Sequence, residues 1–94
     1  MPESAYGRAA LDSELAVLSS TPQGTRNAAL NTTSFKLAGL VAGGELEAGS
    51  TREALLNAAV GIGLSPEEAE ATIDSGFQAG AAAPRSGNRP ERPL

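Results

Sequence analysis

The side chains best suited to hold a ligand gather in one short stretch, residues 24–31, which reads GTRNAALN. The candidates in it are Gly24, Thr25, Arg26, Asn27 and Asn31. Free amides at the start of a helix carry partial positive charge and attract anions, and Arg26 adds a planar fork that suits phosphate. The asparagines, one helical turn apart, can donate to phosphate, sugar or base edges. The stretch therefore suits a phosphate or nucleic-acid contact, with Tyr6 as a stacking surface if it lies nearby.

The same residue types also have a purely structural interpretation. Arg26 can bond the carbonyls that end the preceding helix, and the asparagines can pin the neighbouring loop. Most side-chain hydrogen bonds in proteins are made to backbone or to water. Taken by themselves, the residues therefore favour a structural role, and both interpretations stay open.

No catalytic or metal centre is expected. The chain has no cysteine and no histidine, which excludes disulfides, Cys/His zinc sites, thiol nucleophiles and histidine acid–base chemistry. Its carboxylate pairs fit a solvated surface or the first turn of a helix. These pairs are Glu45/Glu47, Glu67/Glu68 and Glu70/Asp74. We therefore expect a protein that is not an enzyme and that uses no cofactor and no metal.

Size and charge limit what the chain can do. Its 94 residues suit one small domain, and 18 large apolar side chains between residues 5 and 80 can form one modest core. Residues 1–83 hold four basic and ten acidic side chains, a net charge of −6, whereas residues 84–94 hold three arginines and one glutamate. An acidic body is a poor general binder of nucleic acid, because duplex affinity comes largely from basic side chains on phosphates. Any such contact is local or belongs to a larger assembly.

The sequence carries no sign of a membrane span or of export. No apolar run approaches the roughly 20 residues of a transmembrane helix. The start, MPESAYGRAA, lacks the apolar core of a signal peptide. We expect a soluble cytoplasmic protein with no membrane partner, and the sequence leaves its oligomeric state open.

Two helices are expected in the first half of the chain. The first runs from about Ser4 to Ser19, where leucines recur at helical spacing, and Pro22 ends it. The second begins after Thr25, a suitable N-cap, and continues with a broad apolar face to about Ala42. The candidate ligand-binding stretch therefore falls on the entrance of the second helix.

Two more helices are expected in the second half. A capping box at Ser50 or Thr51 with Glu53 predicts the start of the third helix. Its expected buried residues are Leu55, Leu56, Ala59, Val60 and Ile62. The segment GIGLSPEE predicts a left-handed Gly63 at the end of this helix and Ser65 as the cap of the fourth, with Glu68 closing the capping box. A connection this tight predicts an antiparallel hairpin of the third and fourth helices.

The fourth helix carries apolar or small residues at core spacing, and the distance between Gly76 and Gly80 indicates close helix packing. The core residues are Ala69, Ile73, Phe77 and Gly80. Residues 81–94 have no periodicity and three prolines, which predicts a flexible, disordered basic tail or linker. The predicted fold is all-α: a compact four-helix bundle over residues 4–80, followed by this tail.

The stretch GTRNAALNTTSFKLAGLVAGGELE resembles a small helical domain found beside replicative primases of phages, plasmids and integrated elements. That family's pattern is a glycine, one residue, Arg-Asn, two residues, a leucine and then a spaced apolar helix. The matching residues are Gly24, Arg26, Asn27 and Leu30, with Asn31, Phe35, Leu37 and Leu40 in register. The flanking segments are also similar, so the resemblance spans about Tyr6 to Gly80.

In that family the helical domain follows the catalytic domain of primase-polymerase proteins and often precedes a helicase. The resemblance implies a role in priming DNA replication, in which the Arg-Asn helix entrance contacts single-stranded template DNA or nucleotide for a primase catalytic domain. The chain departs from the larger family proteins, since it has no catalytic primase domain, no carboxylate motif of such a domain and no helicase. It is either an excised piece or a free-standing relative. The alternative is a free-standing protein-interaction module that docks on or inhibits a replication or host protein.

Overall fold

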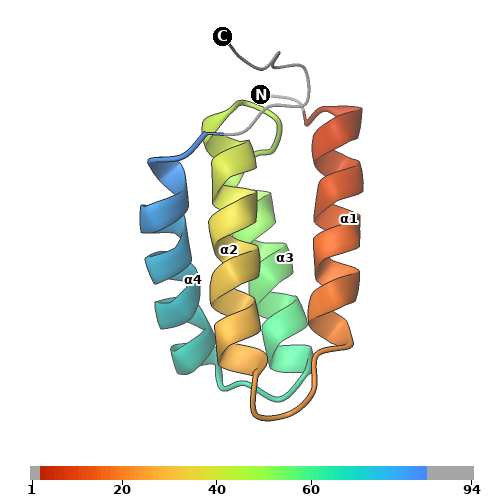
Figure 1. The fold of residues 1–94 in the computed structure, drawn as a ribbon, viewed down its shortest axis with the longest axis vertical. Helices are drawn as coiled ribbons and strands as arrows, with labels where there is room; N and C mark the ends of the chain where they lie inside the picture. The colour runs from red at the N-terminus through yellow and green to blue at the C-terminus, as the bar shows by residue number, and fades with distance from the viewer. Residues whose placement is uncertain (1–2, 85–94) are drawn as a thin grey trace, which may run out of the picture.

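The computed structural model describes residues 3–84, which form four helices and no strand (Figure 1). These helices are α1 (Ala5–Ser19), α2 (Arg26–Ala42), α3 (Ala48–Gly61) and α4 (Pro66–Ala81). The predicted all-α four-helix bundle is confirmed. The predicted disordered tail falls mostly on residues 85–94, which lie outside the described residues. None of the described helices is long and apolar enough to cross a membrane.

The helices alternate in direction, so that α1 and α3 run one way and α2 and α4 run the other (Figure 1). Helix α2 contacts all three other helices, whereas α1 and α4 lie on opposite sides of the bundle and do not touch. The most extensive helix–helix contact joins α2 and α4. These two helices are therefore parallel neighbours, and both begin at the end of the bundle that is lowest in Figure 1.

The core consists mainly of leucines contributed by the first three helices. Its largest fully buried apolar side chains are Leu18, Leu30, Leu37, Leu40, Leu55 and Ile73. The prediction that Val60 is buried is wrong, because that side chain is 43% exposed. The buried line of α3 runs through Thr51, Leu55 and Ala59, four residues apart. Val60 follows Ala59 and is rotated by about 100° away from that line.

Glycines let α4 approach α2 closely, as the Gly76/Gly80 spacing predicted. A Cβ on Gly76 would lie 2.5 Å from the Cβ of Ser34 on α2. A Cβ on Gly80 would lie 2.3 Å from the carbonyl oxygen of Phe35 and 2.7 Å from the Cβ of Ala38. Atoms this close to a Cβ are rigidly attached to the α2 backbone, so any side chain on these two glycines would force the helices apart.

The connection between α3 and α4 confirms the left-handed Gly63 and the Ser65 cap predicted from GIGLSPEE. Gly63 has a φ of +106°, and its N–H donates to the Val60 carbonyl while the Leu64 N–H donates to the Ala59 carbonyl. This pair of bonds is the Schellman arrangement that ends a helix. Ser65 then accepts a hydrogen bond from the Glu68 N–H at 3.2 Å and caps α4. The Glu68 carboxylate accepts from Asn27 of α2, so it serves a contact between helices instead of closing the predicted capping box.

The predicted start of α3 at Ser50 or Thr51 is wrong. The helix begins at Ala48, and the side chain of Glu47 accepts hydrogen bonds from the Gly49 and Ser50 N–H groups. These bonds hold the pKa of the Glu47 carboxyl below its ordinary value, the Ser50 N–H contributing most. Glutamate can therefore take the N-cap role here, three residues before the expected cap.

Candidate nucleic-acid interface

The turn before α2 leaves the amino end of that helix without a side-chain cap. Gly24 has a φ of +101°, a conformation that glycine adopts without strain. Thr25 occupies the predicted N-cap position, but its side chain does not bond the α2 amides. Its hydroxyl donates instead to the Pro22 carbonyl at 3.0 Å. By contrast, Ser4, Glu47 and Ser65 cap the other three helices through their side chains.

The side chain of Arg26 lies across the end of α3. A Cβ on Gly63 would be 2.8 Å from the Arg26 Nη1 atom, so the guanidinium rests on the glycine that ends α3. A cation at this position complements the negative end of the α3 dipole. The Arg26 Nε atom is buried and has no hydrogen-bond partner in the described part of the chain. Arg26 thus packs against the end of α3, whereas the structural interpretation of the sequence had it bond the carbonyls that end α1.

Asn27 joins α2 to α4. Its amide nitrogen donates to the Glu68 carboxylate at 3.1 Å and to the Thr72 hydroxyl at 2.7 Å. Both amide hydrogens of Asn27 are therefore used within the protein, and its side-chain oxygen remains as an acceptor. The structural interpretation of the asparagines holds in part: Asn27 pins a neighbouring element, but that element is α4 and not a loop.

Asn31 lies one turn further along α2 and is exposed at a shallow groove between α2 and α4. This groove, which we call the α2/α4 groove, has a volume of about 330 Å³. Its lining residues are Asn27, Ala28, Asn31, Ala71, Thr72 and Ser75. A second opening of about 230 Å³, the entrance pocket, adjoins it around Asn27. The entrance pocket is lined by Gln23, Gly24, Arg26, Asn27, Leu64 and Glu68.

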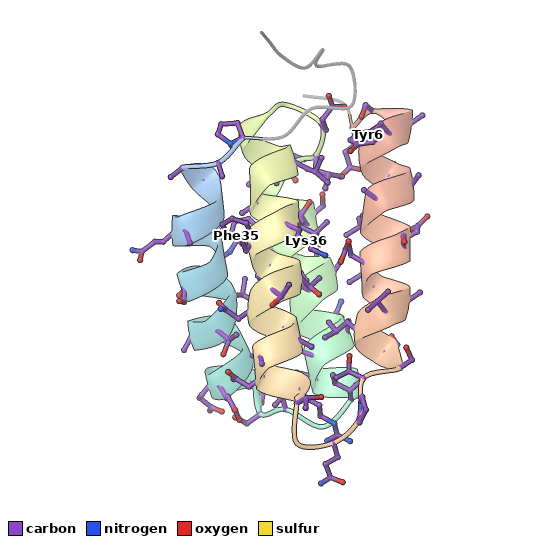
Figure 2. All side chains as sticks on the ribbon, viewed as in Figure 1. Tyr6, Phe35 and Lys36 are labelled. Carbon is purple, nitrogen blue, oxygen red and sulfur yellow. The ribbon has the colours of Figure 1, made fainter. Side chains whose placement is uncertain are left out.

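Tyr6 does not belong to this surface. It lies in the first turn of α1, at the upper end of the bundle, whereas Arg26 begins α2 at the lower end (Figure 2). The 15 residues of α1 span about 22 Å. A stacking role for Tyr6 beside Arg26 is therefore excluded by the antiparallel arrangement of α1 and α2. The structure does bring together Gly24, Arg26, Asn27 and Asn31 along the edge of α2.

The lower end of the bundle combines opposite electrostatic influences. Helices α2 and α4 present their amino ends there, which carry partial positive charge, whereas α1 and α3 present their carboxyl ends, which carry partial negative charge. Glu67 and Glu68 lie in the first turn of α4, whereas the first turn of α2 contains no acidic residue. The most favourable place for an anion is therefore the α2 side of the entrance pocket, next to Arg26.

No protein-family model, curated protein or solved structure matches this chain. The assignment of a function consequently depends on the residues and their geometry. Within residues 3–84, no group of three or more acidic side chains is arranged to hold a metal ion.

Sequence reasoning missed the α4 side of the α2/α4 groove. Thr72 and Ser75 line it together with Asn31, and Glu68 fixes Asn27 at its rim. The Gly76/Gly80 spacing was a sequence signal for this pairing, because it indicated a close helix partner, but it did not identify α2.

Proposed function

We propose that this chain is an accessory helical domain of a DNA-replication primase of the primase-polymerase type. In this proposal, Arg26 and the uncapped amino end of α2 contact a phosphate of single-stranded template DNA or of a nucleotide. A primase catalytic domain or a helicase is the expected protein partner. The proposal combines the Arg-Asn pattern of the sequence with the geometry of the entrance pocket.

One observation carries the proposal, namely which basic side chains in residues 3–84 form ion pairs and which do not. Arg8 pairs with Glu3, Lys36 with Glu14, and Arg52 with Asp74. Arg26 forms no ion pair or hydrogen bond with any described residue, although it lines a pocket that also contains Glu68. The guanidinium of Arg26 lies over the carboxyl end of α3 beside the start of α2, and no described residue bonds it. An unpaired guanidinium is suited to an incoming phosphate.

The surrounding charge limits the strength of this contact. Ten acidic side chains outnumber four basic ones in residues 1–83, and two of the acidic ones begin α4 beside the pocket. One arginine neutralises about one phosphate, which supports only weak, salt-sensitive binding. We therefore propose that the domain positions DNA for a partner that supplies most of the affinity.

The experiment is fluorescence anisotropy with labelled single-stranded DNA, titrated at several salt concentrations. Arg26→Ala is expected to weaken binding about tenfold to a hundredfold, the size of a charge-assisted hydrogen bond. The slope of log affinity against log salt is expected to fall by about 0.7, the value for one phosphate contact on a single strand. Arg8→Ala is the matched control, because Arg8 is exposed at the other end of the bundle and already paired.

A chain ending at Ala83 separates the entrance pocket from the arginines of residues 84–94. Binding that survives this truncation and requires Arg26 supports the proposal. Binding that disappears with the truncation and does not change in Arg26→Ala refutes the proposal. The contact then comes from nonspecific attraction to the arginines of residues 84–94. A large fall in melting temperature for Arg26→Ala, without any DNA binding by the wild type, makes Arg26 a packing residue.

The alternative function, a free-standing interaction module, is favoured by the outward face of α1. An exposed strip on that face is uncharged, and the exposed charged residues Arg8 and Asp12 lie beside it. The strip consists of Tyr6, Ala9, Ser13, Ala16 and Val17. Tyr6 and Val17 are among the large apolar side chains that the fold leaves exposed, at 43% and 60%. This alternative predicts no DNA binding at physiological salt. It also predicts a replication or host protein that co-purifies with the wild type and with Arg26→Ala but is lost with Val17→Asp.

A further inference from the structure

The α2/α4 groove is distinct in character from the entrance pocket beside it. Among the described residues, no charged side chain lines the groove, whereas Arg26 and Glu68 both line the entrance pocket. Ala28 and Ala71 contribute only methyl groups to its lining. At about 330 Å³, the groove lies at the small end of the 300–1,000 Å³ range of ligand pockets. It therefore suits one flat portion of a ligand and not a whole cofactor.

The groove offers hydrogen-bonding groups that the fold does not use. The side chains of Asn31 and Ser75 form no hydrogen bond with any residue in the described part of the chain. Asn27 donates both of its amide hydrogens to Glu68 and Thr72, which leaves its side-chain oxygen as an acceptor. Asn31 presents a donor and an acceptor side by side on the exposed face of α2. The groove is thus neutral and can both donate and accept.

A neutral lining of amides and hydroxyls complements the edge of a nucleobase better than a phosphate. Asparagine pairs with base edges through its adjacent donor and acceptor, and the bases of a single strand leave these edges free. Asn27 borders both openings, so a base in the groove and a phosphate at Arg26 would belong to adjoining parts of one strand. The Glu68 carboxylate, held by Asn27, lies on the phosphate side and restricts where the phosphate can approach.

We propose that the α2/α4 groove is a base subsite, in which Asn31 and Ser75 receive the edge of one unpaired base while Arg26 holds a neighbouring phosphate. This inference rests on the proposed function and adds to it a contact with the base. It assigns Asn31 to ligand recognition and Asn27 to positioning the groove between α2 and α4.

The test compares two single-stranded DNA probes of equal length, oligo-dT and the same backbone without bases. Wild-type protein is expected to bind the abasic probe about threefold to tenfold more weakly, the effect of one or two neutral hydrogen bonds. Asn31→Ala is expected to bring this ratio close to one and to leave binding of the abasic probe unchanged. Asn57→Ala is the matched control, since Asn57 is exposed within α3 and lies outside the groove.

A second variant, Ala71→Leu, fills the groove and removes no hydrogen-bonding group. It is expected to lose the preference for oligo-dT over the abasic probe while Arg26-dependent binding persists. Melting temperatures of all variants verify that each one is folded.

The outcomes separate this inference from the proposed function. Equal wild-type affinity for both probes, with binding still dependent on Arg26, refutes the base subsite and leaves the phosphate contact intact. An equal loss for both probes in Asn31→Ala also refutes it, because Asn31 then contacts the DNA backbone. If neither probe binds at any salt concentration, the proposed function fails and the base subsite fails with it.

Discussion

Replacing Gly76 with alanine tests the close approach of α2 and α4. The added methyl group would lie 2.5 Å from the Ser34 Cβ, 3.0 Å from the Asn31 carbonyl oxygen and 3.1 Å from the Phe35 backbone nitrogen. Carbon atoms in contact prefer separations of about 3.5–4.0 Å. None of these three atoms can rotate away, because each is a backbone atom or a Cβ. The helices must separate by roughly 1 Å to admit the methyl group.

The expected cost combines two opposing terms. Overpacking costs about 1–3 kcal/mol, and contact with backbone favours the upper end of that range. Alanine in a helix interior is more favourable than glycine by about 1 kcal/mol. The free energy of unfolding should therefore fall by about 2 kcal/mol. For a domain of this size, that corresponds to a melting temperature about 8–16 °C lower.

Thermal and urea unfolding followed by circular dichroism measure this change. Gly61→Ala is the matched control, because Gly61 is the last residue of α3 and a Cβ there would have no atom within 4 Å. We expect that variant to equal the wild type or to exceed it by up to about 1 kcal/mol. If Gly76→Ala proves as stable as Gly61→Ala, the inferred contact between α2 and α4 is wrong.

A double-mutant cycle with Ser34→Gly locates the clash. Removing the Ser34 Cβ takes away the atom nearest to the new methyl group. The double variant is therefore expected to lose less stability than the two single variants together, by about 1 kcal/mol. Strict additivity would mean that the penalty at Gly76 arises elsewhere.

Three further changes probe the contact between α2 and α4, the end of α3 and the start of α3. Asn27→Ala removes the link to α4 and should be about 1 kcal/mol less stable than Asn57→Ala, as measured by urea unfolding. Gly63→Ala should cost about 1–2 kcal/mol in the same assay, because its φ of +106° is unfavourable for other residues. Since folding lowers the pKa of Glu47, its cap stabilises α3 at neutral pH and is lost as pH falls below the ordinary carboxyl range. The melting temperatures of wild type and Glu47→Gln should therefore differ at pH 7 and converge at pH 3; a constant difference would contradict this.

Local chemistry explains which parts of the fold could be predicted from the sequence. The end of α3 and the start of α4 are determined by Gly63, Ser65 and Pro66 within a few residues, so their structure was predictable. The start of α3 was not, because Ser50 and Glu53 offered a plausible capping box and Glu47 took the role instead. Two competing caps three residues apart differ too little in free energy for sequence patterns to separate them.

The candidate site also has parts that the sequence predicts and parts that it does not. Arg26, Asn27 and Asn31 were recognisable because they lie on one segment, but the Asn27 partners are 41 and 45 residues away. The hydrophobic periodicity of each helix shows which face is buried but does not show that α2 packs in parallel against α4. The distance of Tyr6 from Arg26 was predictable, since two helices joined by a short turn run antiparallel and begin at opposite ends.

The parallel contact of α2 with α4 has a consequence for the folding pathway. Parallel neighbours cannot be joined by a short turn, so α3 and both of its connections must intervene before Asn27 reaches Glu68. Contacts that close long loops lose more chain entropy on forming and slow folding. We expect α2–α4 docking to be a late step, so that Gly76→Ala mainly accelerates unfolding in stopped-flow experiments, and a purely slower folding rate would place that docking early. Both openings of the candidate site are lined by residues of α2 and α4, so they would form only at that late step.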